Sequence, residues 1–151
     1  MNQDLYKSCI SCFATGIAIV TTDFKGQRYG ITINSLCSVS LNPPMVLYCI
    51  DKSAERFKPF FCAEEFCVNI LDYSQQKLSG AFAKNDKKEW EEFIEKDLKV
   101  KDTKCLLRCK TNYRYEGGDH KIIVASVQDC IVPKSGFKPL CYYRSGYLSF
   151  S

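Results

Sequence analysis

The clearest alternation of apolar and polar residues runs through residues 29–41. One parity is mainly apolar and consists of Ile31, Ile33, Cys37, Val39 and Leu41, whereas the other consists of Thr32, Asn34, Ser38 and Ser40. Because successive side chains of a strand point to opposite faces, this pattern predicts a strand with one apolar face and one face of hydroxyls and an amide. Ser35 and Leu36 interrupt the alternation, as a bulge or a strand end would, and Asn42-Pro43-Pro44 ends it.

Further apolar runs predict more strands, and apolar residues at helical spacing predict short helices. We expect strands over residues 17–22 and 45–51, over 66–71, and within 105–115, 121–132 and 139–150. Helices are expected over 4–15, over 52–61 with Ser53 as the N-cap, and over 74–84, while 85–97 is an amphipathic helix or a surface excursion. Turns are expected at 23–26, 116–119 and 133–136. The sequence thus predicts a mainly β fold, a largely antiparallel barrel of about six or seven strands with short helices.

The size and composition are those of an ordinary globular protein. The chain has 151 residues, enough for a single domain over 1–151, with 46% hydrophobic and 25% charged residues. Its net charge of +4 suits a small anionic ligand and is far from that of a nucleic-acid-binding surface. No stretch approaches the roughly 20 apolar residues of a membrane helix, and the polar residues 1–7 lack the apolar core of a secretory signal. We therefore expect a cytoplasmic protein that binds neither membrane nor nucleic acid.

The chain contains ten cysteines, which is a high number. Without a secretory signal, free thiols are expected in place of disulfides. Cys9-x-x-Cys12 is a candidate metal-binding pair, but the chain has no second such pair and one histidine, so we expect no metal site. Five cysteines lie in predicted strands and are expected to be small buried residues: Cys37, Cys49, Cys67, Cys109 and Cys141. The alternative for Cys37 and Cys49 is a thiol that takes part in redox chemistry.

Three stretches carry residues suited to ligand binding. Short hydroxyls and amides on one strand face can bind a phosphate or polyol, although such residues also simply face water. Ser53 at a helix N-terminus, with Lys52 or Arg56 nearby, can bind a phosphate, and the alternative is an ordinary cap among solvated charges. His120, the single histidine, can donate, accept and titrate near neutral pH, or it can be a partly exposed residue at the start of a strand.

Taken together, these stretches resemble the flavin reductase-like family, whose fold is the FMN-binding split barrel. The first matching residues are Ala14-Thr15-Gly16. They are followed by Gly30-x-Thr32-x-Asn34-Ser35-x-x-Ser38-Val39-Ser40-x-x-Pro43-Pro44, and later by Gly118-Asp119-His120 with Ile123-Val124. The resemblance extends over residues 13–150, nearly the whole chain.

The resemblance implies a set of flavin-contacting residues. In the family, the segment matching 34–40 wraps the flavin ring, ribityl chain and phosphate, and His120 matches a residue on the NAD(P)H side, which makes it the candidate catalytic residue. The implied cofactor-binding residues are Thr32, Asn34, Ser35, Ser38, Val39, Ser40, Cys49, Asp51, Ser53, Arg56, Phe82, Lys84, His120 and Tyr143. Two segments depart from the family pattern: Ala54 replaces a commoner Ser or Thr, and Gly146 directly precedes Tyr147.

The resemblance also implies an activity. It predicts an oxidoreductase that transfers a hydride from C4 of NAD(P)H to N5 of FMN, with FAD possible as the flavin. Such a reaction needs no acid–base pair, in keeping with the absence of an obvious triad or carboxylate pair. The family further implies a homodimer and an electron acceptor, either a protein or an oxygenase. Two alternatives remain: a flavoredoxin-type electron-transfer protein with bound FMN and little NAD(P)H activity, and a binding module without flavin.

Overall fold

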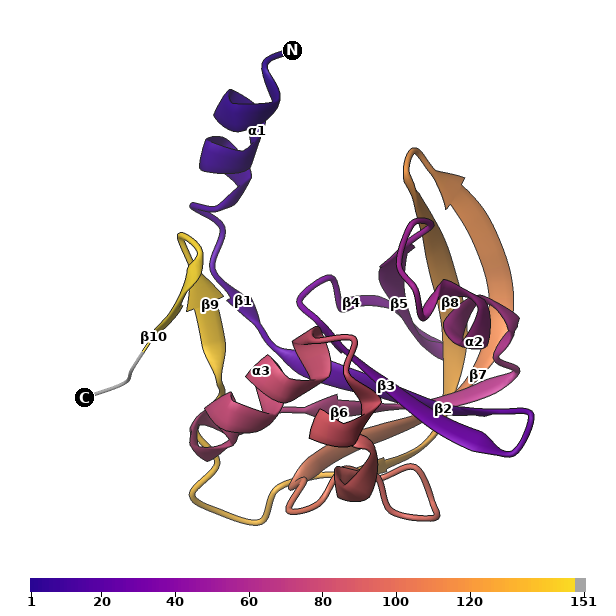
Figure 1. The fold of residues 1–151 in the computed structure, drawn as a ribbon. Helices are drawn as coiled ribbons and strands as arrows, with labels where there is room; N and C mark the ends of the chain where they lie inside the picture. Colours follow the sequence, from indigo (N-terminus) through magenta and orange to yellow (C-terminus); the bar gives the residue numbers. More distant parts are fainter. Residues whose placement is uncertain (149–151) are drawn as a thin grey trace.

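The computed structural model describes residues 1–148, which form two antiparallel sheets (Figure 1). The larger sheet has seven strands in the order β3-β2-β6-β7-β8-β5-β4. Its strands are β2 (Ala18–Phe24), β3 (Gln27–Ile33), β4 (Cys37–Leu41), β5 (Pro44–Asp51), β6 (Glu65–Ile70), β7 (Cys105–Gly117) and β8 (His120–Ile131). The smaller sheet has the order β1-β9-β10 and consists of β1 (Thr15–Gly16), β9 (Cys141–Tyr143) and β10 (Gly146–Leu148).

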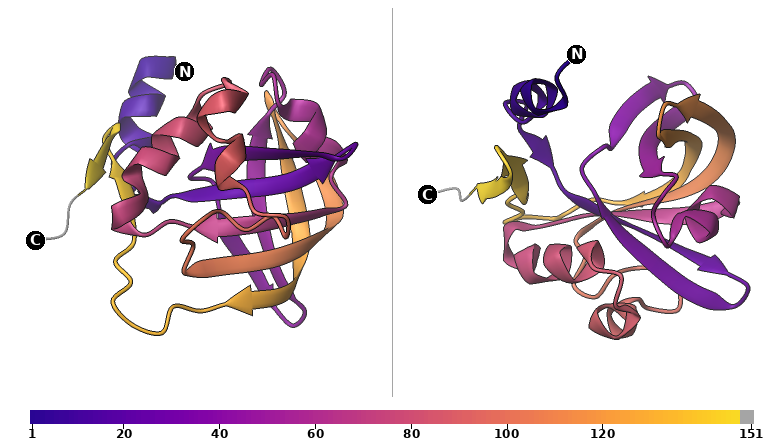
Figure 2. Two further views of the ribbon diagram at one scale, coloured as in Figure 1. Left: turned by 60° about the horizontal axis from the view of Figure 1, so that its bottom comes forward. Right: turned by 45° about the horizontal axis from the view of Figure 1, so that its top comes forward.

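The seven-stranded sheet curves into a barrel that does not close (Figure 2). Its two edge strands, β3 and β4, are consecutive in sequence but lie at opposite ends of the strand order. The predicted mainly β, antiparallel split barrel is therefore confirmed.

Two of the predicted turns close tight hairpins. Lys25 and Gly26 both have positive φ, at 55° and 75°, which is the requirement of the type I′ turn that joins twisted strands such as β2 and β3. Gly118, with φ of 69°, occupies the turn between β7 and β8. The glycines at these positions avoid the steric cost that a Cβ would impose at positive φ.

The predicted strand over 29–41 is wrong as a single element. β3 ends at Ile33 and β4 begins at Cys37, so Ser35 and Leu36 mark a strand end and not a bulge. The apolar residues Val39 and Leu41 are exposed, although the alternation placed them on a buried face. The reason is that β4 is an edge strand that pairs only with β5, with an irregularity between Ser38 and Ser40.

The helices are shorter than predicted. They are α1 (Gln3–Ile10), α2 (Phe57–Cys62) and α3 (Gln76–Ala83), with 3-10 turns η1 (Tyr73–Gln75), η2 (Lys87–Glu89) and η3 (Glu91–Phe93). The expected cap at Ser53 is wrong, because α2 starts four residues later and Ser53 instead donates to Asp51. Residues 85–97 form 3-10 turns in place of a helix, yet Trp90 and Ile94 are buried. Among residues 1–148, no helix combines the length and apolarity that a membrane crossing needs.

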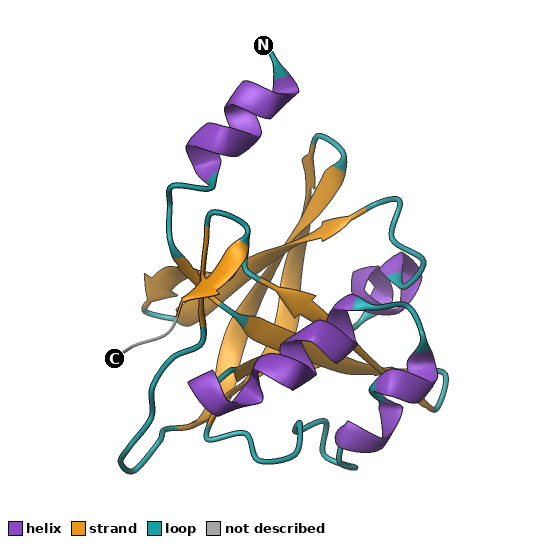
Figure 3. Cartoon of the chain, turned by 60° about the vertical axis from the view of Figure 1, so that its left-hand side comes forward, coloured by secondary structure: helices purple, strands orange, loops and turns teal. Residues whose placement is uncertain are grey.

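Two apolar clusters lie on opposite faces of the large sheet. The inner cluster includes Tyr48, Phe60, Phe66, Val68 and Ile123, and the outer cluster includes Ile19, Leu71, Phe82, Trp90, Val100 and Leu140. Helix α3 and the segment after it lie across the outer face (Figure 3). Burial of these side chains supplies the main driving force for folding.

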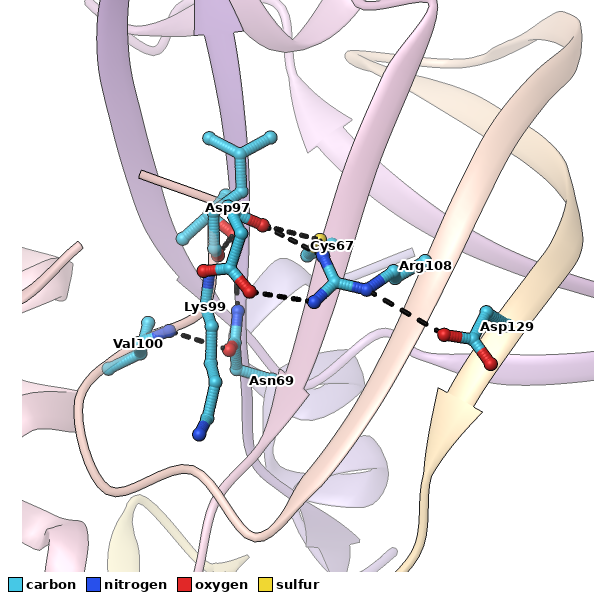
Figure 4. Close-up of polar contacts among 9 residues, drawn as sticks. Cys67, Asn69, Asp97, Lys99, Val100, Arg108 and Asp129 are labelled. Carbon is cyan, nitrogen blue, oxygen red and sulfur yellow. Dashed lines mark hydrogen bonds and ion pairs between the residues drawn. The ribbon is translucent and has the colours of Figure 1, made fainter. Parts of the chain in front are cut away.

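The connection between η3 and β7 is fastened to the sheet by polar side chains (Figure 4). Asn69 is fully buried; its amide donates to Ile19 O at 3.1 Å, and its Oδ1 accepts from the backbone N–H of Val100 at 2.9 Å. Arg108 donates to both the carbonyl and the carboxylate of Asp97, each at 2.8 Å. These contacts hold the connection that carries Asp97 and Val100 in place beside β2 and β6.

The cysteines divide by exposure. All ten are unpaired thiols. Cys67 and Cys109 are buried as predicted, and burial raises the pKa of Cys109 to about 12. Cys49 and Cys141 are half-buried, whereas the prediction of a buried Cys37 is wrong because β4 is an exposed edge strand.

Candidate functional site

An open cavity of about 830 Å³ lies between α1, the small sheet and the loop that follows β3. Its walls come from segments far apart in sequence, because β1 pairs with β9 with Thr15 opposite Tyr142. The lining residues are Lys7, Ile10, Ser11, Phe13, Ala14, Thr15, Gly16, Ile17, Ala18, Asn34, Ser35, Leu36, Cys37, Ile70, Tyr142, Arg144 and Ser145. A cavity of this size and mixed character is typical of a small-molecule or cofactor site.

The loop at one wall is held by Ser35. Its hydroxyl oxygen accepts from the backbone N–H of Cys49 at 3.0 Å and donates to the Cys49 carbonyl at 3.4 Å. This double contact docks the loop between β3 and β4 onto β5. Asn34 and Ser35 are thus the predicted site residues that line the cavity.

Cys49, which this loop contacts, and Asp51 lie on one face of β5. Tyr48 and Ile50, which alternate with them along the strand, are buried on the other face. In the strand register Asp51 lies opposite His120 of β8. Five predicted residues therefore lie near one another at this end of the sheet: Ser35, Cys49, Asp51, Ser53 and His120.

Asp51 and Ser53 form a local turn. The Asp51 carboxylate accepts from both the backbone N–H and the hydroxyl of Ser53, each at 2.8 Å. The hydrogen bond from the Ser53 backbone is the largest cause of a lowered pKa for Asp51. The Ser53 hydroxyl is therefore engaged in a turn and its carboxylate partner is held ionised.

His120 starts β8 with its side chain partly exposed. Its Nδ1 lies 2.7 Å from Asp119 Oδ1. Beside it, Lys52 donates to Glu116 and to Gly118 O at 2.7 Å, and hydrogen bonds from Lys121 and Lys52 lower the pKa of Glu116 to about 2. The charges at this hairpin are thus paired with one another, and the imidazole contacts Asp119 through Nδ1.

A second group of predicted residues lies under α3, away from the cavity. Thr32 donates to Ser79 O at 2.7 Å, and Ser79 Oγ lies 2.9 Å from the Tyr147 hydroxyl. Phe82 is fully buried and stacks on Trp90 with ring centroids 5.7 Å apart. In this conformation Thr32 and Phe82 make contacts with the protein itself.

Arg56 is a buried cation. Its guanidinium donates to Gly30 O and, at 3.1 Å, to Phe82 O, and it lies 5.3 Å from the Trp90 ring. Burial lowers its pKa, and its Nε is buried without a hydrogen-bond partner among the described residues. No carboxylate forms an ion pair with it within residues 1–148. Arg56 thereby fixes the backbone of β3 to the end of α3 and gives this region positive charge.

The remaining predicted residues lie at the periphery. Lys84 is exposed, with its Nζ 3.6 Å from Glu89 Oε2. Ser38, Val39 and Ser40 lie on the edge strand β4. Tyr143 is half-buried on β9, whereas its neighbour Tyr142 lines the cavity.

Several cavity residues were absent from the predicted set. Thr15, Gly16, Tyr142, Arg144 and Lys7 all line it. Thr15 Oγ1 is buried without a hydrogen-bond partner among the described residues, which marks it as a group available to a ligand. The signal for Thr15 and Gly16 is the Ala14-Thr15-Gly16 match, and Tyr142 directly precedes the predicted Tyr143.

Known proteins resemble this chain in sequence and in fold. Residues 10–151 match the model of the flavin reductase like domain. The FMN reductase (NADH) SmoA of Agrobacterium fabrum is 32% identical over 154 residues, covering 99% of this chain and 87% of that protein. The reductase component of 4-hydroxyphenylacetate 3-monooxygenase of Thermus thermophilus is 30% identical over 96% of this chain and 95% of that protein. The structure of the flavin reductase PheA2 superposes with a TM-score of 0.87 at 28% identity, covering 100% of this chain and 99% of that one.

These matches extend over nearly the whole length of the chain, and the flavin reductase PheA2 shares its fold. The resemblance noted from the sequence is confirmed, and the chain belongs to the flavin reductase-like family.

Proposed function

We propose that this protein is an NAD(P)H-dependent flavin reductase that uses FMN. The observation that carries the proposal is the loop between β3 and β4, which Ser35 docks onto β5 and which forms one wall of the 830 Å³ cavity. Family membership over residues 10–151 and relatives that are named NADH-dependent FMN reductases support the same activity.

The cavity has the chemical features that FMN requires. Tyr142, Ile10 and Phe13 offer apolar surface to a flavin ring, and the polar groups of Asn34, Ser35 and the unpartnered Thr15 Oγ1 can bind ring heteroatoms or ribityl hydroxyls. Arg144 and Lys7 add positive charge for a phosphate. We propose that Ser38, Val39 and Ser40 extend this surface along β4.

When bound, FMN supplies the hydride-accepting N5 and the capacity to store two electrons. The chain supplies binding and orientation. Ser35 fixes the loop that carries Asn34, so that these donors are held before the ligand arrives. His120, whose Nδ1 contacts Asp119 and whose strand neighbour is Asp51, has its Nε2 edge available to orient a nicotinamide carboxamide. No residue of the chain needs to act as nucleophile.

The relatives favour particular partners. Since relatives include the reductase component of a monooxygenase, we propose that reduced flavin passes to an oxygenase or another electron acceptor. We also propose a homodimer in the cytoplasm. The aromatic content of 13% supports an apolar contact with a second copy.

The visible absorption spectrum tests the flavin site. The purified protein is mixed with excess FMN or FAD, passed through a gel-filtration column and scanned. Flavin absorbance that elutes with the protein, greater for FMN than for FAD, supports the proposal. NADH or NADPH is then added without oxygen, and bleaching by either one is expected.

Two results would contradict the proposal. Retained flavin that neither nicotinamide bleaches would identify an electron-transfer flavoprotein of the flavoredoxin type. If no flavin is retained, steady-state oxidation of NADH or NADPH with free FMN is measured, and lack of turnover there would overturn the assignment.

A further inference from the structure

Two cysteines lie at the C-terminal end of α1. Cys9 belongs to the last turn of the helix, and Cys12 follows two residues after its end. The backbone N–H of Cys12 donates to Cys9 O at 3.1 Å, which closes a four-residue turn. Such a turn brings its first and last Cα atoms within about 7 Å, and disulfides usually span Cα separations of about 4.4–6.8 Å. Both residues are exposed, so the two thiols are placed to react with each other and with a small oxidant.

A guanidinium lies beside one of these thiols. Arg144 Nη2 is 3.9 Å from Cys12 Sγ, and that thiol donates to Ser8 O at 3.5 Å. The guanidinium is positioned by its own backbone, because Arg144 N–H donates to Ser11 O at 3.0 Å from the tight turn between β9 and β10. Cys12 is thus an exposed cysteine beside a positive group, which is the kind of surroundings in which reactive cysteines are found.

Cys67 also accepts a hydrogen bond from a guanidinium, but it is buried, whereas Cys12 is exposed. Arg108 Nη1 lies 3.7 Å from Cys67 Sγ (Figure 4). Cys67, however, is 3% exposed and is covered by the segment that carries Asp97. Burial raises its pKa and keeps it in the unreactive thiol form. Within residues 1–148, Cys12 is the cysteine that combines the guanidinium contact with exposure and a second thiol three residues away.

We propose that Cys9 and Cys12 form a redox-modification site, in which hydrogen peroxide converts the dithiol into a Cys9–Cys12 disulfide. The Cys12 thiolate attacks one peroxide oxygen, the O–O bond breaks, and Cys12 becomes a sulfenic acid while the other oxygen takes a proton and leaves as water. The Cys9 sulfur then displaces the sulfenic hydroxyl, which leaves as a second water. In total the two thiols lose two electrons and two protons, and one peroxide is reduced to two waters.

The site lies at the rim of the cavity, because Ile10, Ser11 and Phe13 of the same turn line its wall. A disulfide here constrains the chain between α1 and β1. The proposal concerns the chemistry of the thiols alone, so it is tested without any measurement of flavin or nicotinamide.

Peptide mass spectrometry gives a direct test. The reduced full-length protein is freed of reductant, treated with hydrogen peroxide at equal concentration, alkylated with iodoacetamide and digested with trypsin. Cleavage after Lys7 and Lys25 releases residues 8–25, which contain Cys9 and Cys12 and no other cysteine. We expect this peptide to lose both alkyl groups and become two hydrogen atoms lighter than its reduced, unalkylated form, and dithiothreitol to reverse the change.

The exposed Cys130 provides an internal control. It is the single cysteine of the tryptic peptide 122–134 and is expected to stay fully alkylated at the same peroxide dose. In Cys9→Ser the Cys12 sulfenic acid cannot be resolved and is expected to be captured by dimedone. Arg144→Gln should slow disulfide formation about fivefold, and Arg144→Lys should restore most of the rate.

Three results would overturn the proposal. The first is a peptide 8–25 that stays alkylated until Cys130 is oxidised. The second is a disulfide that joins Cys9 or Cys12 to any other cysteine. The third is an Arg144→Gln variant that reacts as fast as the unmodified protein.

Discussion

Ser35 and the backbone of Cys49 are joined by two hydrogen bonds, one in each direction, at 3.0 and 3.4 Å. Ser35 belongs to the loop between β3 and β4, and Cys49 lies near the C-terminal end of β5. The Ser35 hydroxyl thereby holds the loop that carries Asn34 against strand β5. Preorganisation of this kind lowers the entropy that a ligand must otherwise overcome on binding.

Replacing Ser35 with Ala should weaken FMN binding. The substitution removes both hydrogen bonds, together worth about 1 kcal/mol, and frees the loop, so the dissociation constant for FMN should rise about fivefold. Titration of FMN absorbance or fluorescence measures the change. Ser135→Ala, in the exposed loop after β8, is the matched control and should leave affinity unchanged. Equal affinities for both variants would show that the loop position does not matter to the site.

His120→Gln tests the nicotinamide side of the site. If the His120 ring orients the nicotinamide, kcat/KM for NADH or NADPH should fall about tenfold. Because the ring is partly exposed and its hydrogen bond is to its neighbour Asp119, the free energy of unfolding should change by less than about 0.5 kcal/mol. Steady-state kinetics and urea denaturation provide the two measurements. Tyr115→Phe on the adjacent strand serves as control, and an unchanged kcat/KM for His120→Gln would exclude a role in the reaction.

Arg56→Met separates two roles of the buried guanidinium. The substitution leaves the carbonyls of Gly30 and Phe82 without their donor, so we expect a loss of about 2–4 kcal/mol in the free energy of unfolding even without FMN. Lys58→Met, an exposed change in helix α2 just after Arg56, should have almost no effect. If Arg56→Met left stability unchanged but abolished FMN binding, its main role would be in the cofactor site.

Gly30 and Gly80 form a matched pair for Ala substitution. A Cβ on Gly30 would lie 2.5 Å from Phe82 Cδ1, and the Phe82 ring is itself fixed against Trp90. Gly30→Ala should therefore destabilise the protein by about 1–3 kcal/mol through overpacking. A Cβ on Gly80, inside α3, meets no atom within 4 Å, so Gly80→Ala should stabilise the protein by about 0.5–1 kcal/mol. Thermal or urea denaturation compares the two, and a neutral Gly30→Ala would show that the ring can move.

Asp72 should make stability depend on acid pH. Burial acts to raise its pKa, but hydrogen bonds from Ser74 and Lys138 and the charge of Lys104 outweigh it and lower the pKa to about 2. Because this folded-state pKa lies below the unfolded one, the ionised carboxylate contributes stability that is fully present above about pH 4 and is lost as pH falls through about 2. The contribution at neutral pH is about 2 kcal/mol.

Asp72→Asn checks this pH dependence. At pH 7 the variant should be less stable than the original protein by about 2 kcal/mol, and the difference should shrink as pH falls from about 4 to about 2. Urea denaturation at several pH values measures it. A difference that stayed constant across this range would show that the loss comes from packing or hydrogen bonding and not from the charge.

Local sequence signals predicted many of the elements. The β-branched run at 17–22 became β2, and the turn residues Gly26 and Gly118 close hairpins as expected. These elements depend on neighbours in the chain, so their sequence carries the necessary information. The exposed position of β4 does not depend on neighbours in the chain. Val39 and Leu41 follow the apolar parity of a buried strand, yet they lie on an exposed edge of the sheet. Ser53 likewise has the hydroxyl that a helix N-cap needs, but its backbone N–H and its hydroxyl both donate to the Asp51 carboxylate.

The candidate site shows the same division. Asn34 and Ser35 were identified by a local motif, and both reach the cavity. Tyr142 faces Thr15 only because β9 pairs with β1, a long-range pairing that no short motif encodes. Arg56 was predicted from its charge as a phosphate ligand, and the structure shows its guanidinium bonded to two backbone carbonyls. Residue type therefore indicated the chemistry of these side chains, but tertiary pairing decides what each of them touches.

The pairing of β5 with β8 also has a consequence for synthesis on the ribosome. β5 is synthesised before β8, but in the sheet it lies between β4 and β8. Asp51 can pair with His120 only after residue 120 has left the ribosome. Until then the β4–β5 hairpin has no neighbour in the sheet, while β2, β3 and β6 can already pair. Contacts of such long sequence separation form late because the loop-closure entropy must be overcome first. The contact between Ser35 and Cys49 joins residues close in sequence, but the cavity also needs Tyr142, which is made near the end of the chain. A stalled or truncated nascent chain therefore exposes the β4–β5 hairpin and lacks a finished cofactor site.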